Sequence, residues 1–350
     1  MKSKCNLLCA LFLAGAFFSQ AQSKTGEDVR KYHQEWDAAG VETLEVTNKF
    51  GEVKVTNSTG AQVIIDVTVR VESESESVVQ KILGDINVGF SKTGGTAKAE
   101  TTIRDDFRTK RNFSIDYAIS IPSDKNLTIT NKYGNTVVDE LLGKGIFNIG
   151  YGNMNANRLL GSAKGKITLN LDYGKCDVSS LGDATVTIAY SKFYVDEANN
   201  LTLNSKYSGL KLGKADEIKA ESKYDGFEVE KVSSLVANLK YTSVKIGELD
   251  KKLILTSGYG GIRVDRIPAS FEQVVVNNSF GAVNLGFASD SQYRISAECE
   301  YCEIEYPGSK FKGTSEKDDF TKKIAGTIGG TSPKGDVTIK SRYGKINLEH

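Results

Sequence analysis

Residues 201–246 read LTLNSKYSGL KLGKADEIKA ESKYDGFEVE KVSSLVANLK YTSVKI, and this stretch decides the fold. Within it, Tyr207, Tyr224 and Tyr241 recur at intervals of 17 residues. On both sides of each tyrosine, apolar residues alternate with polar ones, as in a strand with one buried face. A unit this short cannot bury its own apolar face, so the repeat predicts copies that stack on one another.

The same motif extends in both directions along the chain, with flanking steps of 18–22 residues. Its aromatic residue stands at Phe50, Tyr133, Tyr151, Tyr173, Tyr190, Tyr207, Tyr224, Tyr241, Tyr259, Phe280, Tyr301 and Tyr343. The repeat therefore occupies most of the chain.

The apolar positions change phase at the aromatic residue. Before Tyr207 they are Leu201 and Leu203, at even offsets, and after it they are Leu210 and Leu212, at odd offsets. The chain must turn at this step, and we expect the glycine that often follows to supply the unusual backbone angles. Because the aromatic shares the phase of the apolar positions before it, we expect an aromatic ladder inside the core rather than an exposed platform for sugar stacking.

The predicted fold is all-β, a right-handed parallel β-helix or solenoid with rungs of about 17–22 residues. Stacked rungs pair each backbone group with the rung above and below. An antiparallel meander is the alternative, because it shows the same alternation. Long segments with a helical period are missing from the sequence, which argues against helical bundles and doubly wound folds.

Both ends of such a stack need caps, because bare strand edges associate with one another. Residues 62–72 and 113–121 alternate as long strands, and residues 77–86 carry the apolar stripe of a short helix, which predicts an N-terminal capping sheet. Residues 302–336 interrupt the repeat and predict a cap or a protruding loop, while residues 22–40 predict a helix or an arm. The expected division is a signal peptide (1–21), an N-terminal arm with the first rung and capping region (22–127), solenoid repeats (128–301), and a C-terminal cap with the last rung (302–350).

The N-terminus has the pattern of a secretory signal peptide. Lys2 and Lys4 precede an apolar run from Leu7 to Phe18, which is too short to span a bilayer comfortably. Small residues at Ser19 and Ala21 predict cleavage before Gln22. We therefore expect an exported protein of a Gram-negative bacterium, periplasmic or on the cell surface, with no transmembrane segment in the mature chain.

Charge and cysteine content exclude several classes of function. The 45 basic and 44 acidic residues give a net charge of +1, too small a field to recruit nucleic acid. Cys299 and Cys302 form a C-E-Y-C motif, but no second pair accompanies it and the only histidines are His33 and His350. We expect no zinc site, no cofactor and a structural role for these cysteines. Cys176 takes an apolar position of its repeat and is expected in the core.

The combination of elements resembles one known family. Its features are the signal peptide, the N-x-[YF]-G-x-V entry motif at Asn48, Phe50, Gly51 and Val53, the long-strand insertion with its helix, and the Tyr-Gly strands. They resemble the adhesin-like β-strand-repeat proteins of Gram-negative envelopes, a family of unknown function labelled "putative adhesin". The resemblance covers nearly all of the mature chain, apart from residues 302–336, and implies the solenoid. It brings no catalytic residues, and its label rests on fold analogy.

One candidate binding feature is a column of lysines. Lys206, Lys223 and Lys240 each precede the aromatic of consecutive rungs and should stack on the outer surface. Such a column predicts binding of an acidic glycan or another polyanion, unless neighbours such as Glu221 and Asp225 compensate its charge.

A second candidate is the stretch from Arg104 to Arg111, RDDFRTKR. Arg104, Phe107, Arg108 and Arg111 could contact a partner through an aromatic ring flanked by guanidinium groups. The alternative is a hairpin loop that its charges keep hydrated.

Three classes of function follow. The first is a non-enzymatic envelope or surface protein that binds a glycan or an envelope protein through its rigid outer face. The second is a structural or signalling envelope component without a soluble ligand, and the third is a carbohydrate-active enzyme. Asp172 and Asp225 lie three rungs, about 15 Å, apart, which is too far for paired glycosidase carboxylates. Histidine-dependent catalysis is disfavoured because both histidines lie near the chain ends. The sequence leaves the oligomeric state open.

Overall fold

A computed structural model describes residues 27–161 and 165–350. The predicted signal peptide and its cleavage site lie outside these residues. None of the described helices is long and apolar enough to cross a membrane.

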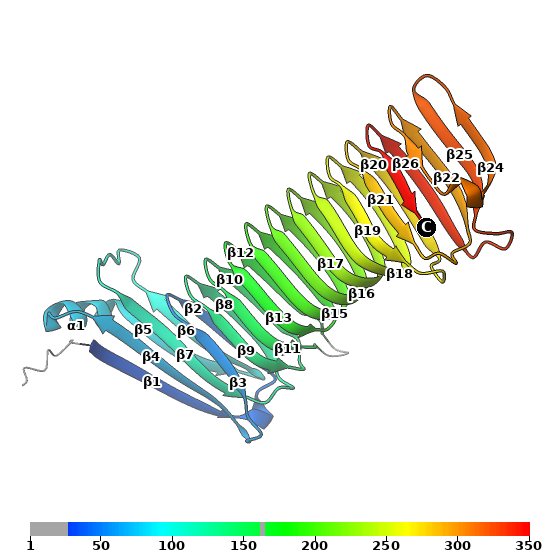
Figure 1. Ribbon diagram of the computed structural model, residues 1–350. Helices are drawn as coiled ribbons and strands as arrows, with labels where there is room; N and C mark the ends of the chain where they lie inside the picture. Colours follow the sequence, from blue (N-terminus) through cyan, green and yellow to red (C-terminus); the bar gives the residue numbers. More distant parts are fainter. Residues whose placement is uncertain (1–26, 162–164) are drawn as a thin grey trace, which may run out of the picture.

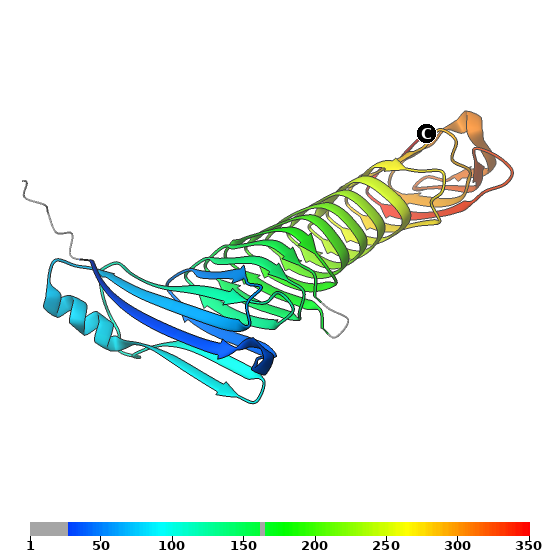
Figure 2. The same ribbon diagram turned by 90° about the horizontal axis from the view of Figure 1, so that it is seen from below.

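Strands make up most of the described chain, which forms an elongated stack with a cap at each end (Figures 1 and 2). The all-β prediction is therefore confirmed. Each repeat forms one rung, which consists of a first strand, a corner at the aromatic residue and a second strand.

The first strands, in spatial order, are β2 (Thr43–Lys49), β8 (Asn126–Lys132), β10 (Gly145–Gly150), β12 (Ile167–Asp172), β14 (Ala184–Ala189), β20 (Gln273–Ser279), β26 (Gly335–Arg342) and β22 (Tyr293–Glu300). The second strands are β3 (Val53–Asn57), β9 (Thr136–Leu141), β11 (Met154–Leu159), β13 (Lys175–Leu181), β19 (Ile262–Ile267), β21 (Val283–Phe287), β27 (Ile346–Glu349) and β23 (Ile304–Glu305). In the middle of the stack, four long strands each join the second strand of one rung to the first strand of the next: β15 (Lys192–Lys206), β16 (Gly209–Lys223), β17 (Gly226–Lys240) and β18 (Ser243–Gly258).

Neighbouring rungs pair in parallel, with equivalent residues of the repeat opposite one another. Leu203 is the partner of Ala220, which in turn is the partner of Ala237. This register puts equivalent apolar residues into continuous buried columns. The antiparallel meander is therefore excluded for the rungs, although strands at both ends of the stack pair antiparallel and make the sheet mixed.

The predicted internal aromatic ladder is wrong, because the corner aromatics face solvent. All twelve have positive φ angles of 51–62°, and from Tyr133 onward they are 46–53% exposed. The left-handed backbone conformation makes the turn at the aromatic itself. As a result two consecutive residues, such as Lys206 and Tyr207, both point outward, while the next residue, Ser208, is buried.

The role expected for the corner glycines is also wrong. The unusual backbone angles belong to the aromatic residues, and the glycines are required because adjacent corners approach closely. A Cβ on Gly152 would lie 2.0 Å from the carbonyl oxygen of Gly134, and a Cβ on Gly134 would lie 1.9 Å from that of Gly51. A methyl group cannot be accommodated at these distances without moving the backbone.

The N-terminal cap adds one parallel strand to each face of the first rung, and further strands pair antiparallel with these two. On one face, β4 (Gln62–Glu72) pairs with β1 (Glu27–Asp37) and β7 (Phe113–Ile121), and β7 pairs in parallel with β3. The other face carries the hairpin of β5 (Ile86–Thr93) and β6 (Thr96–Ile103), with β6 parallel to β2. The helix α1 (Glu76–Asp85) buries Val79, Ile82 and Leu83.

The expectation of a helix or an arm before residue 40 is wrong for its described part. Residues 27–37 form the edge strand β1, which is followed by the short 3₁₀ helix η1 (Ala38–Gly40). Pairing with the long strand β4 decides this conformation, which the polar sequence of β1 does not specify by itself.

The C-terminal cap is a hairpin rather than a protruding loop. After η2 (Gly308–Lys310), the strands β24 (Phe311–Lys317) and β25 (Thr321–Ile328) pair with each other, and β25 pairs antiparallel with β22. The last rung in the sequence, β26 and β27, then lies between the rung of β20 and β21 and the rung of β22 and β23.

Candidate functional site

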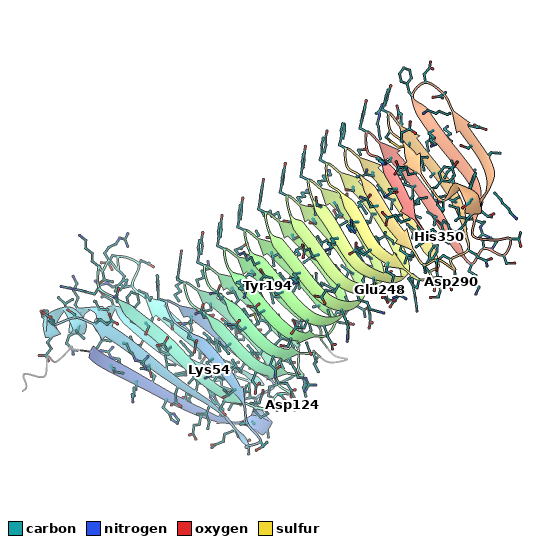
Figure 3. All side chains as sticks on the ribbon, in the orientation of Figure 1. Lys54, Asp124, Tyr194, Glu248, Asp290 and His350 are labelled. Carbon is teal, nitrogen blue, oxygen red and sulfur yellow. A yellow bond between two sulfur atoms is a disulfide. The ribbon has the colours of Figure 1, made fainter. Side chains whose placement is uncertain are left out.

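The corner aromatics form a continuous row of stacked rings along one edge of the stack, which we call the ring row (Figure 3). Neighbouring ring centroids are 4.5–5.1 Å apart and neighbouring ring planes differ by 2–18°. At the two ends of the row, the ring of Phe113 packs at a tilt on Phe50, and the ring of Phe320 packs at a tilt on Tyr301. The centroids are 5.2 Å apart in both pairs. The row is thus closed by a tilted ring at each end.

This stacking determines what the row can bind. Each ring covers the face of its neighbour, so the faces that a sugar would need for stacking are already occupied. The ring edges remain exposed, together with the phenolic hydroxyl groups of the ten tyrosines. The row therefore presents hydroxyl groups at the spacing of the rungs, about 4.8 Å. Each hydroxyl can donate and accept a hydrogen bond.

The predicted lysine column is present beside the ring row. Lys206 is the register partner of Lys223, and Lys223 is the partner of Lys240. All three side chains are exposed, and none forms an ion pair in the part of the chain that the structure describes. Each lysine directly precedes an exposed ring, so a row of ammonium groups runs parallel to the row of hydroxyls. Repulsion between neighbours is on the order of 1 kcal/mol in a water-like medium.

Asp225, which sequence analysis offered as compensation for the lysines, is instead buried beneath them. Its carboxylate accepts hydrogen bonds from the hydroxyls of Ser205 (2.6 Å) and Ser222 (2.5 Å) and from the backbone N–H groups of Ser208 (2.6 Å) and Lys223 (3.2 Å). These four donors satisfy the carboxylate inside the corner. Its charge is not available as a direct salt-bridge partner for the ammonium groups.

The corners beneath the lysine column differ from the glycine corners elsewhere. The residue after the aromatic is Ser191, Ser208, Asp225 or Thr242, and its side chain is turned inward. The backbone N–H of each of the first three donates to the side-chain oxygen of the next one along the stack, at 2.6–3.2 Å. This chain of hydrogen bonds fixes the backbone that carries the lysines and the rings.

A shallow groove of about 320 Å³ lies on the other side of the ring row. Its floor consists of small residues two positions after the aromatic, including Gly226, Ser243 and Gly261. The long side chains of Lys245 and Arg263 line it on the side away from the corner. Small residues at this position leave the exposed edge accessible from both faces of the stack.

The loop of residues 104–112 lies at one end of the ring row. Phe107 packs edge-on against Phe113 with centroids 5.3 Å apart, which joins it to the cluster at Phe50. Arg104 forms ion pairs with Asp85 and Asp106, and the hydrogen bond to Arg104 is the main cause that lowers the pKa of Asp106.

The remaining arginines of this loop make local contacts. Arg108 donates to the carbonyl of Phe107, and the backbone N–H of Arg111 donates to Thr109. From Phe50 to Tyr207 there are five ring steps, or about 24 Å by rung spacing. The structure therefore places the loop on the same edge as Lys206 without bringing the two together.

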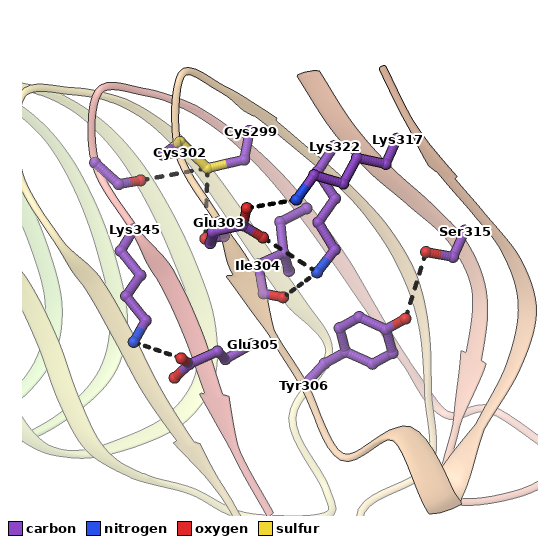
Figure 4. Close-up of polar contacts among 11 residues, drawn as sticks. Cys299, Cys302, Glu303, Ile304, Glu305, Tyr306, Ser315, Lys317, Lys322 and Lys345 are labelled. Carbon is purple, nitrogen blue, oxygen red and sulfur yellow. Dashed lines mark hydrogen bonds and ion pairs between the residues drawn. A yellow bond between two sulfur atoms is a disulfide. The ribbon is translucent and has the colours of Figure 1, made fainter. Parts of the chain in front are cut away.

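The three cysteines of the described chain are buried or bonded. Cys176 is fully buried, as predicted, and burial raises the pKa of its thiol. Cys299 and Cys302 form a disulfide across the corner at Tyr301 (Figure 4). Residues three apart in an extended strand point to opposite faces, but the left-handed conformation of Tyr301 turns the chain between these two cysteines and brings their sulfur atoms together.

Beside the disulfide, Glu303 accepts from Lys317 at 2.8 Å and lies 3.5 Å from Lys322 (Figure 4). These two ammonium groups, that of Lys317 most strongly, lower the pKa of Glu303. These two lysines, unlike those of the lysine column, therefore have an acidic partner.

Sequence reasoning missed the exposure of the ring row and therefore its hydroxyl groups. One pattern in the sequence could have revealed it. The residue before the aromatic is polar or small at most corners, as in Lys132, Asp172 and Ser279, and the residue after it is Gly, Ser, Asp, Thr or Cys. The small residue after the aromatic is the one that fits inside the corner, very close to the corner of the next rung. The polar residue and the aromatic before it are then left on the outside.

No family model and no curated protein matches the chain. A solved structure titled a putative cell adhesion protein, from Clostridium sporogenes, is similar at 8% identity, covering 92% of this chain and 99% of that chain, with a TM-score of 0.21. A structure titled a putative adhesin, from Parabacteroides merdae, is similar at 12% identity, covering 73% and 95%, with a TM-score of 0.38.

A structure titled a putative lipid binding protein, from Parabacteroides distasonis, is similar at 11% identity, covering 73% of this chain and 96% of that chain, with a TM-score of 0.33. No activity is inferred from these titles. Two of these solved structures thus carry titles that name adhesion.

Proposed function

We propose that this chain is a non-enzymatic, exported protein of the bacterial envelope, a right-handed β-solenoid that binds a linear acidic glycan along its ring row. The observation that carries the proposal is the column of Lys206, Lys223 and Lys240, aligned in register beside the exposed rings and without ion-pair partners among the described residues.

A linear polymer fits this edge better than a compact ligand does. Hydroxyls and ammonium groups repeat at the spacing of the rungs, and the buried hydrogen bonds from Ser191 to Thr242 hold them in fixed positions. A rigid, periodic surface loses little conformational entropy when it binds a periodic partner. The groove beside the ring row is shallow and holds about 320 Å³ of space, which suits contact along an edge.

The charge of the column selects for acidic groups. Three exposed ammonium groups repel one another, and anions of a polymer such as a polyuronate relieve that repulsion. Phenolic hydroxyls beside them can bond to both carboxylates and sugar hydroxyls. The ring faces are stacked on one another, so aromatic stacking of sugars has no part in this proposal.

An enzymatic role is not supported by the carboxylates near this edge. Asp225 is enclosed by four hydrogen-bond donors, and Asp172 belongs to a rung three steps away. His33 bonds to Asp66 and Glu35 in the N-terminal cap, away from the ring row. In this proposal the protein therefore binds its ligand and catalyses no reaction on it.

The second candidate is a structural envelope component without a soluble ligand. It is favoured by the self-stacking of the rings, which gives the row a purely structural use: each stacked pair contributes about 0.5–1.5 kcal/mol beyond burial. The two candidates differ in whether the edge binds a polymer.

The test is a calorimetric titration of the mature chain, residues 22–350, with polygalacturonate and, separately, with a neutral linear glucan. We expect binding of the acidic polymer only, weakened by added salt. Replacing Lys206, Lys223 and Lys240 by Gln should weaken it about tenfold, since each exposed pair contributes roughly 0.2–1 kcal/mol.

A matched control replaces Lys166, Lys214 and Lys251 by Gln, which changes the charge equally at the opposite corner of the stack. This variant should bind like the parent chain. Equal affinity of the parent and the column variant, or no binding of any acidic polymer, would favour the structural candidate.

A further inference from the structure

The C-terminal part of the chain is built in an order that differs from its sequence. Residues 293–350, which we call the C-terminal module, contain β22 to β27 (Figure 1). The first strand of the module, β22, does not pair with the rung of β20 and β21 that precedes it in the sequence. The last rung of the module pairs with that rung, because β26 pairs with β20 and β27 pairs with β21. The first strand of the module is thereby moved outward by one rung.

The module is tied together internally by charge. Arg294 pairs with Asp336, Arg342 with Glu300, and Lys345 with Glu305. All three pairs join the last rung to the rung of β22 and β23. Among the described residues, no ion pair joins the module to the rung of β20 and β21. The module therefore holds together more strongly by charge than it holds to the rest of the stack.

Unsatisfied polar groups gather where the module docks. The buried hydroxyls of Ser291 and Tyr293 and the side-chain oxygen of Asn278 have no hydrogen-bond partner. These are three of the six such atoms found among the described residues. A buried, unpaired polar group costs about 1–3 kcal/mol. The docking surface thus carries such a penalty at three atoms, whereas the corners at Asn131 and Ser257 each carry it at one.

Apolar contacts hold the module in place against this penalty. The ring of Tyr293 stacks on Phe287 at 4.4 Å and lies 5.8 Å from Phe271. Residues 288–292 connect the rung of β20 and β21 to β22, and the last rung of the chain lies between the two. The connection therefore spans about two strand spacings, or roughly 10 Å. Five residues reach about 17 Å when extended, so the connection is short but not fully stretched in the closed chain.

We infer that the edge formed by β20 and β21 is a docking site for the C-terminal module of a second copy of this chain. Residues 288–292 are the hinge of this exchange. The second copy offers the same strand register, the same apolar contacts and an identical module, so the contacts between the module and the edge of β20 and β21 are reproduced between chains. Exchange of an identical element between two copies is a low-cost route to a dimer.

An exchanged dimer would carry two ring rows. Two joined binding edges raise the apparent affinity for a polymer that reaches both of them. The inference itself does not depend on any glycan, because its contacts lie within the protein.

The exchange is tested with cysteines on separate full-length mature chains. Asn277 and Lys340 are exposed register partners across the docking surface. A chain with Asn277→Cys is unfolded in denaturant together with a chain that carries Lys340→Cys. The pair is refolded at high protein concentration and then oxidised. We expect a disulfide-linked heterodimer whose yield rises with protein concentration during refolding, measured by non-reducing electrophoresis and mass spectrometry.

Two control pairs define the exchanging unit. Thr256→Cys and Asn277→Cys, on separate chains, mark register partners within the body of the stack and should give no heterodimer. Glu298→Cys and Lys340→Cys mark partners inside the module and should link only when both are on one chain. A heterodimer from this last pair would show that the final strands exchange alone, which contradicts the module as the unit.

A single chain with both Asn277→Cys and Lys340→Cys shows that the two positions can be bridged. If this chain forms its internal disulfide and the mixed chains form no heterodimer at any concentration, the inference is overturned.

Discussion

The rings of Phe280 and Tyr343 stack with their centroids 4.9 Å apart, although 63 residues separate them in the sequence. Tyr343 also stacks on Tyr301, with the centroids 5.0 Å apart. Its ring therefore lies between those of Phe280 and Tyr301, which precede it in the sequence. The row is continuous only because the last rung is inserted between two earlier ones.

Replacing Tyr343 by Ala removes two stacked contacts and should destabilise the C-terminal module by about 1–3 kcal/mol. Tyr343→Phe keeps the ring and should be nearly neutral, since Phe280 already occupies the row. Amide hydrogen exchange of β22 and β26 measures the difference. Equal protection in the Ala and Phe variants would show that ring stacking does not hold the module.

Gly152→Ala should be destabilising by about 1–3 kcal/mol or more, because its Cβ would lie 2.0 Å from the carbonyl oxygen of Gly134. The matched control is Gly258→Ala, where a Cβ meets no atom within 4 Å and φ is not positive. Denaturant unfolding of the two variants should separate them clearly. A neutral Gly152→Ala variant would contradict the close approach of the corners.

Asp225→Ala should destabilise the middle of the stack, because it leaves the hydroxyls of Ser205 and Ser222 and two backbone N–H groups without their acceptor. The expected loss is several kcal/mol, given about 1–3 kcal/mol for each buried group left unpaired. Glu221→Ala removes a carboxylate from an exposed position of the same rung and should change stability by less than about 0.5 kcal/mol. Thermal unfolding of the two variants measures the contrast, and similar losses would refute the buried acceptor.

Removing the hydroxyls at Tyr190, Tyr207, Tyr224 and Tyr241 by substitution with Phe should preserve the fold, as Phe50 and Phe280 show that a plain ring is accepted. Polygalacturonate affinity should fall about thirtyfold or more, since each of the four hydrogen bonds contributes about 0.5–1.5 kcal/mol. The control variant replaces Tyr306 by Phe, which lies outside the ring row. Unchanged affinity in the fourfold variant would leave the lysines as the only binding groups.

The sequence was sufficient to predict the all-β class, the aligned lysine column and the buried position of Cys176, because these depend on alternation and on the constant 17-residue step. It misplaced the ring row, since alternation assumes extended backbone and Tyr207 is in the left-handed conformation. The inserted last rung could not be predicted, because its motif at Tyr343 is equally compatible with either neighbouring level. Pairing between strands distant in sequence decides that position.

Similarly, the sequence could not show that Asp225 serves as a buried acceptor. Its donors come from two consecutive rungs, and only the closed corner brings them together. The same holds for Phe107, whose contact with Phe113 depends on how the N-terminal cap meets the first rung.

The most direct test of the central claim is lysine acetylation of the mature chain, with and without saturating polygalacturonate, read by mass spectrometry at each lysine. We expect the polymer to protect Lys206, Lys223 and Lys240, while Lys166, Lys214 and Lys251 at the opposite corner react at unchanged rates. Binding of the polymer without protection of the column, or with equal protection at both corners, would contradict a binding site on the ring-row edge.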